Sequence, residues 1–165
     1  SSLTRKLKAM ATQVTESQGI QSYRDRAEIY HGVALCKQKT RELLEGISLP
    51  KGLLPLDIEE MGHDPSSGFV WMKQKSKKEH KFKRINKVVS YDAEVTVFAE
   101  KGRLRKLTGV KSKEILIWVA LSDIYLENPS SDKLVFGIPS GLTRTYPASA
   151  FDLEEDKADG QKNKN

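Results

Sequence analysis

Few residues of this chain combine the type and the spacing that chemistry requires. Ser140 lies in Gly137-Ile138-Pro139-Ser140-Gly141, which resembles the nucleophile elbow of serine hydrolases only loosely. The serine stands one position late, and no helical pattern follows it to complete the elbow. A hairpin turn explains the segment better, with a weak esterase-type hydrolase as the alternative. Ser130 and Lys133 have Ser-x-x-Lys spacing, but in a polar turn that leaves the lysine hydrated.

The residues that commonly bind metals are scattered along the chain. The three histidines, His31, His63 and His80, do not stand at metal-ligand spacing from one another. Cys36 has no second thiol with which to form a ligand pair or an internal disulfide. It falls on the apolar face of an expected helix, where a small buried hydrophobe is the simplest role. We therefore predict no catalytic residue, no metal and no cofactor, and favour a protein that is not an enzyme.

Positive charge is the strongest chemical signal in the sequence. The net charge is +6, and residues 73–87 hold eight basic side chains against one acid, while residues 101–113 hold six against none. Such a surface attracts the phosphate groups of anionic lipid or nucleic acid. The alternative is a solvated sheet edge, where lysine discourages aggregation. Nucleic acid is the less favoured partner, because no known motif is present and Phe82 is the one clear stacking candidate among the basic residues.

The apolar pattern predicts a mainly β protein with N-terminal helices. Residues 21–48 are typical of a helical hairpin, whose first helix places Tyr23, Ala27 and Tyr30 on one face and whose second helix ends near Gly46. From Leu53 onward the apolar period is two, and turn signals recur at intervals of about eight to twelve residues. This pattern predicts an antiparallel or mixed β-sandwich or flattened barrel of about eight to nine short strands.

The stretch Glu114–Leu126 is expected to form the centre of this β structure. Its first part, Ile115 to Leu121, is apolar without a break and rich in β-branched and aromatic residues. Such a short run is typical of a strand that is buried on both faces. We expect Trp118 and Trp71 to pack in the core, and Trp118→Ala to cost about 3–5 kcal/mol of stability.

These elements divide the chain into four parts. Residues 1–20 form an N-terminal extension. Part of it is disordered or, if the native chain starts at Met10, is not native sequence. Residues 21–48 form the helical hairpin, 49–153 the β-sandwich domain, and 154–165 a disordered charged tail. No apolar window approaches the length of a membrane span, and no secretory signal stands out. We therefore expect an intracellular, cytoplasmic protein, and the sequence does not indicate its oligomeric state.

Six short motifs, in order along the chain, resemble those of a known family. They are Leu49-Pro50-Lys51-Gly52-Leu53-Leu54-Pro55, Gly68-Phe69-Val70-Trp71, Val89-Ser90-Tyr91, Glu100-Lys101-Gly102, Lys106-Leu107-Thr108-Gly109-Val110-Lys111 and Ile117-Trp118-Val119. From Tyr23 to Phe151 the chain resembles the plant family of unknown function that includes the Smaller-with-Variable-Branches proteins. The resemblance implies a β-sandwich with N-terminal helices. It also implies either binding of lipid-like or chlorophyll-like amphiphiles or a weak esterase-type activity, and it carries over no catalytic residue.

With this resemblance, the residues predict a non-catalytic binding module for an amphipathic small molecule or lipid, such as a chlorophyll-like molecule or an anionic amphiphile. A two-layer β fold can hold an apolar tail between its sheets or at an open end, while basic side chains bind an anionic head. The candidate residues are Lys81, Lys83, Arg84, Arg103, Arg105 and Trp71. The alternatives are the weak esterase, a sandwich filled by its own side chains, and a basic surface that binds an anionic membrane or nucleic acid.

Overall fold

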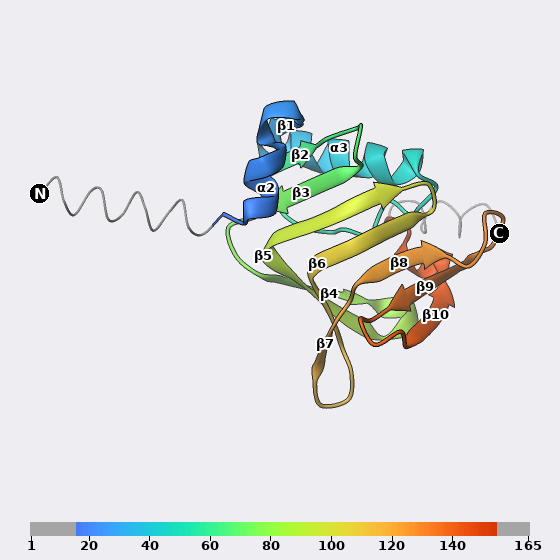
Figure 1. The fold of residues 1–165 in the computed structure, drawn as a ribbon. Coiled ribbons are helices and arrows are strands. Elements are labelled where there is room, and N and C mark those ends of the chain that lie inside the picture. The colour runs from blue at the N-terminus through green and yellow to red at the C-terminus, as the bar shows by residue number, and fades with distance from the viewer. Residues whose placement is uncertain (1–15, 155–165) are drawn as a thin grey trace, which may run out of the picture.

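A computed structural model describes residues 16–154. They form a mainly β protein with helices near the N-terminus, which confirms the predicted fold class (Figure 1). The N-terminal elements are α2 (Gln18–Tyr23), η1 (Arg24–Arg26), β1 (Glu28–His31) and α3 (Val33–Gly46). The further strands are β2 (Glu60–His63), β3 (Phe69–Lys73), β4 (Lys78–Phe82), β5 (Lys87–Glu100), β6 (Arg103–Lys113), β7 (Trp118–Ala120), β8 (Asp123–Leu126), β9 (Lys133–Gly137) and β10 (Thr143–Pro147). Two short 3₁₀ helices are η2 (Lys83–Ile85) and η3 (Ala148–Phe151). Most of the predicted N-terminal extension and charged tail lies outside the described residues.

All ten strands within residues 16–154 belong to one antiparallel sheet. Its order is β1-β2-β3-β5-β6-β8-β9-β10, while β4 pairs with β5 and β7 with β6. Strand β5 is long enough to pair with β4 along its first part and with β3 along its second part. The pairing of β5 with β6 contains register shifts between Tyr91 and Phe98, and such irregularities bend and twist a long strand pair. The described residues thus form ten strands in one open sheet, where the sequence predicts about eight to nine strands in a sandwich or flattened barrel.

The main core lies on the face of the sheet that α3 and residues 47–58 cover. Leu44 of α3 and Leu53 of the following segment are buried in it. The hydroxyl of the fully buried Tyr91 on β5 donates a hydrogen bond to the carbonyl of Leu53, at 2.9 Å. Cys36 is also buried and its thiol donates to the carbonyl of Tyr30 at 3.3 Å, which confirms it as a small buried side chain. Burial raises the pKa of this thiol.

A second, smaller core lies on the other face of β3. Alternate residues of a strand point to opposite faces, so that Val70 and Met72 join the main core while Phe69 and Trp71 join the second one. Ile20 of α2 completes the second core. Strand β3 is therefore buried on both faces, and the N-terminal segment provides the cover on the second face (Figure 1).

The helical prediction for the N-terminal part is correct only in its second half. Helix α3 ends at Gly46 and buries Cys36, as expected, and it also buries Thr40 and Leu44. The preceding segment is a short helix, a 3₁₀ turn and then strand β1, in which Tyr30 pairs with Met61 of β2. A helix through Tyr30 would forgo these hydrogen bonds to a strand about thirty residues further along, and tertiary pairing of this kind overrides local periodicity.

The prediction of a buried central strand over Glu114–Leu126 is wrong. Strand β6 ends at Lys113, and the amide of Glu114 donates to the carbonyl of Ile117 at 2.8 Å to close a tight turn. Ile115 and Leu116 are 94% and 91% exposed, and Trp118 is 36% exposed. The turn reverses the chain beyond the body of the sheet, as Figure 1 shows below β6, so these side chains have no layer to pack against. Only the later part of the stretch, from Leu121, contributes to the core.

Candidate functional site

The six residues that the sequence predicts as ligand-binding do not come together. Arg103 and Arg105 pair with Glu100 and Phe98 at one end of the β5–β6 ladder. Lys81, Lys83 and Arg84 lie near the other end, on β4 and in η2, and are exposed. Trp71 is on β3, in the second core. In this arrangement the head group of one ligand could not contact all five basic side chains. Their roles in binding stay a prediction.

The two arginines on β6 already have partners on the protein. Arg103 is 3.1 Å from a carboxylate oxygen of Asp123 and lies over the ring of Tyr125, 4.6 Å from its centroid. Arg105 is 2.5 Å from Glu100 and lies 5.0 Å from the centroid of Phe98. Both guanidinium groups therefore cover aromatic rings on the outer surface of the sheet, a stabilising role that needs no ligand.

Trp71, the sixth predicted residue, is fully buried. Its ring lies against Gly62 of the neighbouring strand, where a Cβ would be only 2.2 Å from the ring atoms. The indole N–H donates to a carboxylate oxygen of Glu60 at 2.9 Å, and the guanidinium of Arg24 lies 5.4 Å from the ring centroid. Core packing, the simpler of the two roles considered for Trp71, is what the structure shows.

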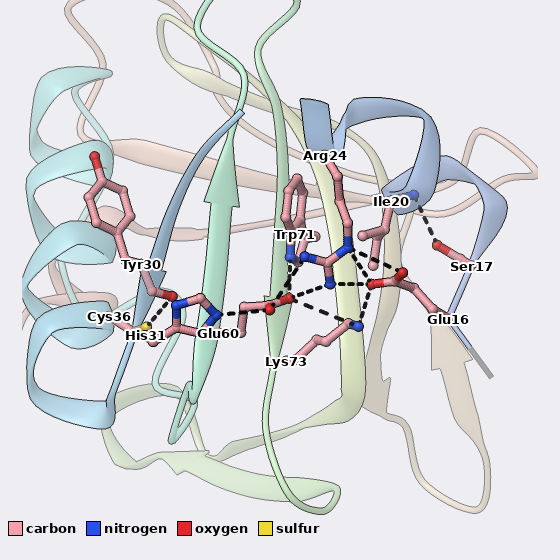
Figure 2. A network of polar contacts seen from close by, with 10 residues as sticks. All are labelled: Glu16, Ser17, Ile20, Arg24, Tyr30, His31, Cys36, Glu60, Trp71 and Lys73. Atoms are coloured by element: carbon pink, nitrogen blue, oxygen red, sulfur yellow. Dashed lines mark hydrogen bonds and ion pairs between the residues drawn. The ribbon is translucent and has the colours of Figure 1, made fainter. Parts of the chain in front are cut away.

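Glu60 is the centre of a polar network that fastens the N-terminal segment to the sheet (Figure 2). Across the strands it faces His31 on one side and Lys73 on the other. His31 Nε2 is 3.1 Å from Oε1, and Arg24 Nη2 donates to Oε2 at 2.8 Å. Arg24 also bonds Glu16, which is 2.5 Å from the ammonium of Lys73. This network of ion pairs and hydrogen bonds therefore joins the N-terminal segment to strands β1, β2 and β3.

The electrostatics of this network indicate a structural role. Burial alone would raise the pKa of Glu60, but hydrogen bonds from Trp71 and Arg24 and the positive charge of Arg24 lower it overall. The hydrogen bond from Arg24 likewise lowers the pKa of Glu16. Both carboxylates stay ionised near neutral pH, and both oxygens of Glu60 accept bonds from the protein. Glu60 is thus poorly suited to accept or donate a proton in a reaction.

A different site lies at the end of the sheet where β7 and β10 approach each other. A pocket of about 400 Å³ opens there, and we refer to it as the β7–β10 pocket. Its apolar lining comes from β7, β9, the turn before β10 and the segments next to them: Val119, Leu121, Phe136, Ile138, Leu142 and Tyr146. Its polar lining consists of Ser112, Glu114, Thr143 and Arg144. The pocket is partly open to solvent, and its lining residue Val119 directly follows Trp118 in sequence.

The rim of the β7–β10 pocket carries an excess of positive charge. The carboxylate of Glu114 is 3.0 Å from the ammonium of Lys87 and 3.3 Å from Nε of Arg144. Lys87 is not among the lining residues, and its side chain is mostly buried, with an exposed fraction of 16%. Burial raises the pKa of the Tyr146 hydroxyl, which therefore stays neutral. Two cations that share one carboxylate leave a net positive charge for an anionic group to bind.

The hydrolase alternative gains no geometric support. Ser140 is exposed in the turn between β9 and β10, where the amide of Gly141 donates to the carbonyl of Ile138 at 2.9 Å. The hairpin-turn interpretation is confirmed. The three histidines lie on β1, β2 and β4, none of which neighbours β9 or β10 in the sheet.

Within residues 16–154, no three His, Cys, Asp or Glu side chains are close enough together to hold a metal ion. In the same part of the chain, no helix has the length and apolar character needed to cross a membrane.

Sequence reasoning missed the residues of the β7–β10 pocket. Phe136 and Ile138 have the alternation of an ordinary core strand, and nothing local shows that a pocket lies beside them. One signal was available: a single acid, Glu114, separates the strongly basic residues 101–113 from the apolar run that begins at Ile115. This change of composition at Glu114 is compatible with a turn as well as with a strand interior.

Comparison with known proteins gives a family and no closer relative. A model of DUF538, described as proteins of unknown function, matches residues 40–152, more than half of the chain. No curated protein and no solved structure matches the chain. The matched residues contain strands β2 to β10, and with them the whole β7–β10 pocket, whereas Arg24 and His31 of the Glu60 network precede them.

Proposed function

Since the chain belongs to DUF538, a family of proteins of unknown function, we propose its function from the geometry: it is a non-catalytic binding module for an amphipathic molecule with an anionic head. The ligand binds in the β7–β10 pocket, with its apolar part against Phe136, Ile138 and Leu142. Its head lies at the rim, near Arg144 and Lys87. This is the ligand class that the sequence favours, at a site different from the predicted one.

The observation that carries the proposal is an open, mostly apolar pocket with cations at its rim. Its volume of about 400 Å³ falls within the range of about 300–1,000 Å³ typical of small-molecule sites. Six of its ten lining residues are apolar or aromatic, and such a lining favours a hydrocarbon chain or ring system. Because the pocket is partly open to solvent, the head group of the ligand stays in water, where it reaches the two cations.

The polar lining supports binding over catalysis. Its hydroxyls belong to Ser112, Thr143 and Tyr146, and its carboxylate, Glu114, is held by two cations. A nucleophilic hydroxyl needs a base within hydrogen-bond reach. The one carboxylate of the lining is instead ion-paired with Lys87 and Arg144.

The direct test is a titration of the full chain with a single-chain alkyl phosphate kept below its micelle concentration. Binding is followed by calorimetry and by the fluorescence of Trp118, which directly precedes the lining residue Val119 on β7. Arg144→Gln should weaken binding about tenfold, the effect expected for one charge-assisted hydrogen bond. Val119→Trp should abolish binding, because the larger side chain occupies the pocket.

Arg105→Gln is the matched control, since Arg105 also pairs through Nε with a glutamate but lies at the far end of β6. Its affinity for the alkyl phosphate should equal that of the native chain. Absence of saturable binding by the folded native chain would overturn the proposal. An equal loss of affinity in the Arg144 and Arg105 variants would show that the phosphate binds to general surface charge and not in the pocket.

A further inference from the structure

The turn between β6 and β7 presents the most exposed apolar side chains of residues 16–154. Ile115, Leu116 and Ile117 are 94%, 91% and 64% exposed, and Trp118 at its base is 36% exposed. Leu142, in the neighbouring turn between β9 and β10, is 70% exposed. We call Ile115–Trp118 the apolar tip. In Figure 1 the hairpin that carries it extends away from the body of the sheet.

The apolar tip is held in an ordered hairpin. The amide of Glu114 donates to the carbonyl of Ile117, and β6 and β7 pair from Lys113 and Trp118 onward. The backbone groups at the base of the turn are thus satisfied within the hairpin, while the aliphatic side chains point into solvent. Contiguous exposed apolar surface of this kind is typical of an interaction site, because water disfavours it and ordinary folding would bury it.

Basic residues surround the apolar tip. Lys111 and Lys113 lie on the exposed face of β6, and the ammonium of Lys113 is 5.7 Å from the centroid of the Trp118 ring. Arg144 lies across the pocket and shares Glu114 with Lys87. Within residues 109–120 and 138–147 Glu114 is the one acid, against Lys111, Lys113 and Arg144. The apolar tip is therefore bordered by basic side chains, and we call Lys111, Lys113 and Arg144 its positive collar.

We propose that the apolar tip inserts into an anionic lipid bilayer and docks the protein on its surface. The three aliphatic residues enter the acyl region, Trp118 lies at the level of the head groups, and the lysines contact the lipid phosphates. Tryptophan favours this interfacial position, and lysine extends its ammonium toward the head groups. The tip is a single turn of chain, and an insertion confined to one turn suits the depth of about 5–10 Å at which interfacial segments bury.

The charge around the tip favours a bilayer over a second copy of the chain. The chain carries a net charge of +6, so two tips that met would bring two positive collars together, and like charges oppose such contact. An anionic membrane surface attracts the same collar. Docking also brings the β7–β10 pocket close to the lipids, because its lining residue Val119 directly follows the tip and Leu142 lies in the neighbouring turn. This last consequence rests on the proposed function, whereas docking itself does not.

The test is co-sedimentation of the full chain with vesicles of phosphatidylcholine, either alone or mixed with phosphatidylserine. We expect binding to the mixed vesicles only, and weaker binding as salt rises. Leu116→Ser should reduce the vesicle affinity roughly tenfold or more. The matched control is Leu35→Ser, at another partly exposed leucine, on α3, which should bind as the native chain does. Lys113→Gln should weaken binding, while Lys101→Gln, at an exposed lysine of the β5–β6 turn, should not.

Acyl chains brominated near the head group give a second readout. They should quench Trp118, which is exposed, and leave Trp71, which is fully buried in the second core, unquenched. The inference is overturned if the folded native chain ignores anionic vesicles, or if Leu116→Ser and Leu35→Ser bind equally well. It is also overturned if the tip mediates self-association that vesicles do not compete away.

The alkyl phosphate titration separates this inference from the proposed function. Leu116→Ser should lose vesicle binding and keep the monomeric ligand, whereas Val119→Trp should lose the ligand and keep the vesicles. Vesicle binding by a native chain that fails to bind the alkyl phosphate would refute only the pocket. Binding of the alkyl phosphate without any vesicle binding would refute only the tip.

Discussion

Gly62→Ala tests whether the ring of Trp71 needs bare backbone beneath it. A Cβ at Gly62 would lie 2.2 Å from two atoms of the ring, far inside the carbon–carbon contact distance of about 3.5–4.0 Å. The ring has little freedom to retreat, because it is fully buried and bonded to Glu60 at 2.9 Å, with Arg24 over its face. Either strand β2 or the ring must therefore move.

The cost follows from these two movements. Overpacking a well-packed core costs about 1–3 kcal/mol, and a strained or lost hydrogen bond from the indole to Glu60 adds about 1 kcal/mol. We expect Gly62→Ala to lower the free energy of unfolding by about 2–4 kcal/mol. Gly46→Ala is the control, because no atom lies within 4 Å of a Cβ at this helical position. It should change the free energy by less than about 1 kcal/mol, in the stabilising direction.

Equilibrium unfolding in urea, followed by fluorescence and circular dichroism, gives these free energies. Trp71→Leu, combined with Gly62→Ala, should cost less than the sum of the two single changes, because the smaller side chain relieves the clash. The reasoning is refuted if Gly62→Ala stays within about 0.5 kcal/mol of the native chain. Strict additivity in the double variant would likewise show that the methyl group and the ring do not meet.

Three further changes test other parts of the fold. The pKa of Glu60 is lowered in the folded chain, so its ionised form stabilises the fold at pH values above its ordinary pKa. This stability is lost as the pH falls through the lowered pKa. Glu60→Gln should therefore flatten the acid limb of a curve of unfolding free energy against pH. Trp118→Ala should cost less than about 1 kcal/mol and Trp71→Ala about 3–5 kcal/mol in urea unfolding, and equal costs would contradict the exposure of Trp118. Tyr91→Phe should cost about 1–3 kcal/mol by calorimetry, because it leaves the carbonyl of Leu53 without its buried donor; an unchanged melting temperature would show that water replaces the hydroxyl.

The features that the sequence predicts correctly are those with local causes. One of the recurring turn signals is Asp64-Pro65-Ser66-Ser67-Gly68, and a hairpin loop forms there, in which the Asp64 carboxylate accepts bonds from Ser66 and Ser67. Helix α3 forms where apolar residues follow helical spacing and ends at Gly46. The mainly β class follows from alternation and turns, which each strand carries in its own residues.

The features that the sequence does not predict depend on distant parts of the chain. An apolar run such as Ile115 to Leu121 has the same pattern whether it lies in a core or at the tip of a hairpin, and only the turn at Glu114 decides between them. Trp71 and Arg24 are forty-seven residues apart in sequence. They meet because β2 and β3 place Glu60 beneath the N-terminal segment, where both side chains donate to its carboxylate. The β7–β10 pocket lies between strands that pair with other partners, β7 with β6 and β10 with β9, and this is a property of the assembled strands.

The long hairpin of β5 and β6 determines the order in which the chain can assemble. Only Lys101 and Gly102 join the two strands, so the entropy lost in closing this loop is small and the hairpin can form early. Strand β1, by contrast, must find β2 across all of α3 and the segment that follows it. Amide hydrogen exchange should therefore be slowest along β5 and β6 and faster in α2 and β1. The N-terminal segment then behaves as a separate cooperative unit, which can open and close over Trp71 while the rest of the sheet stays folded.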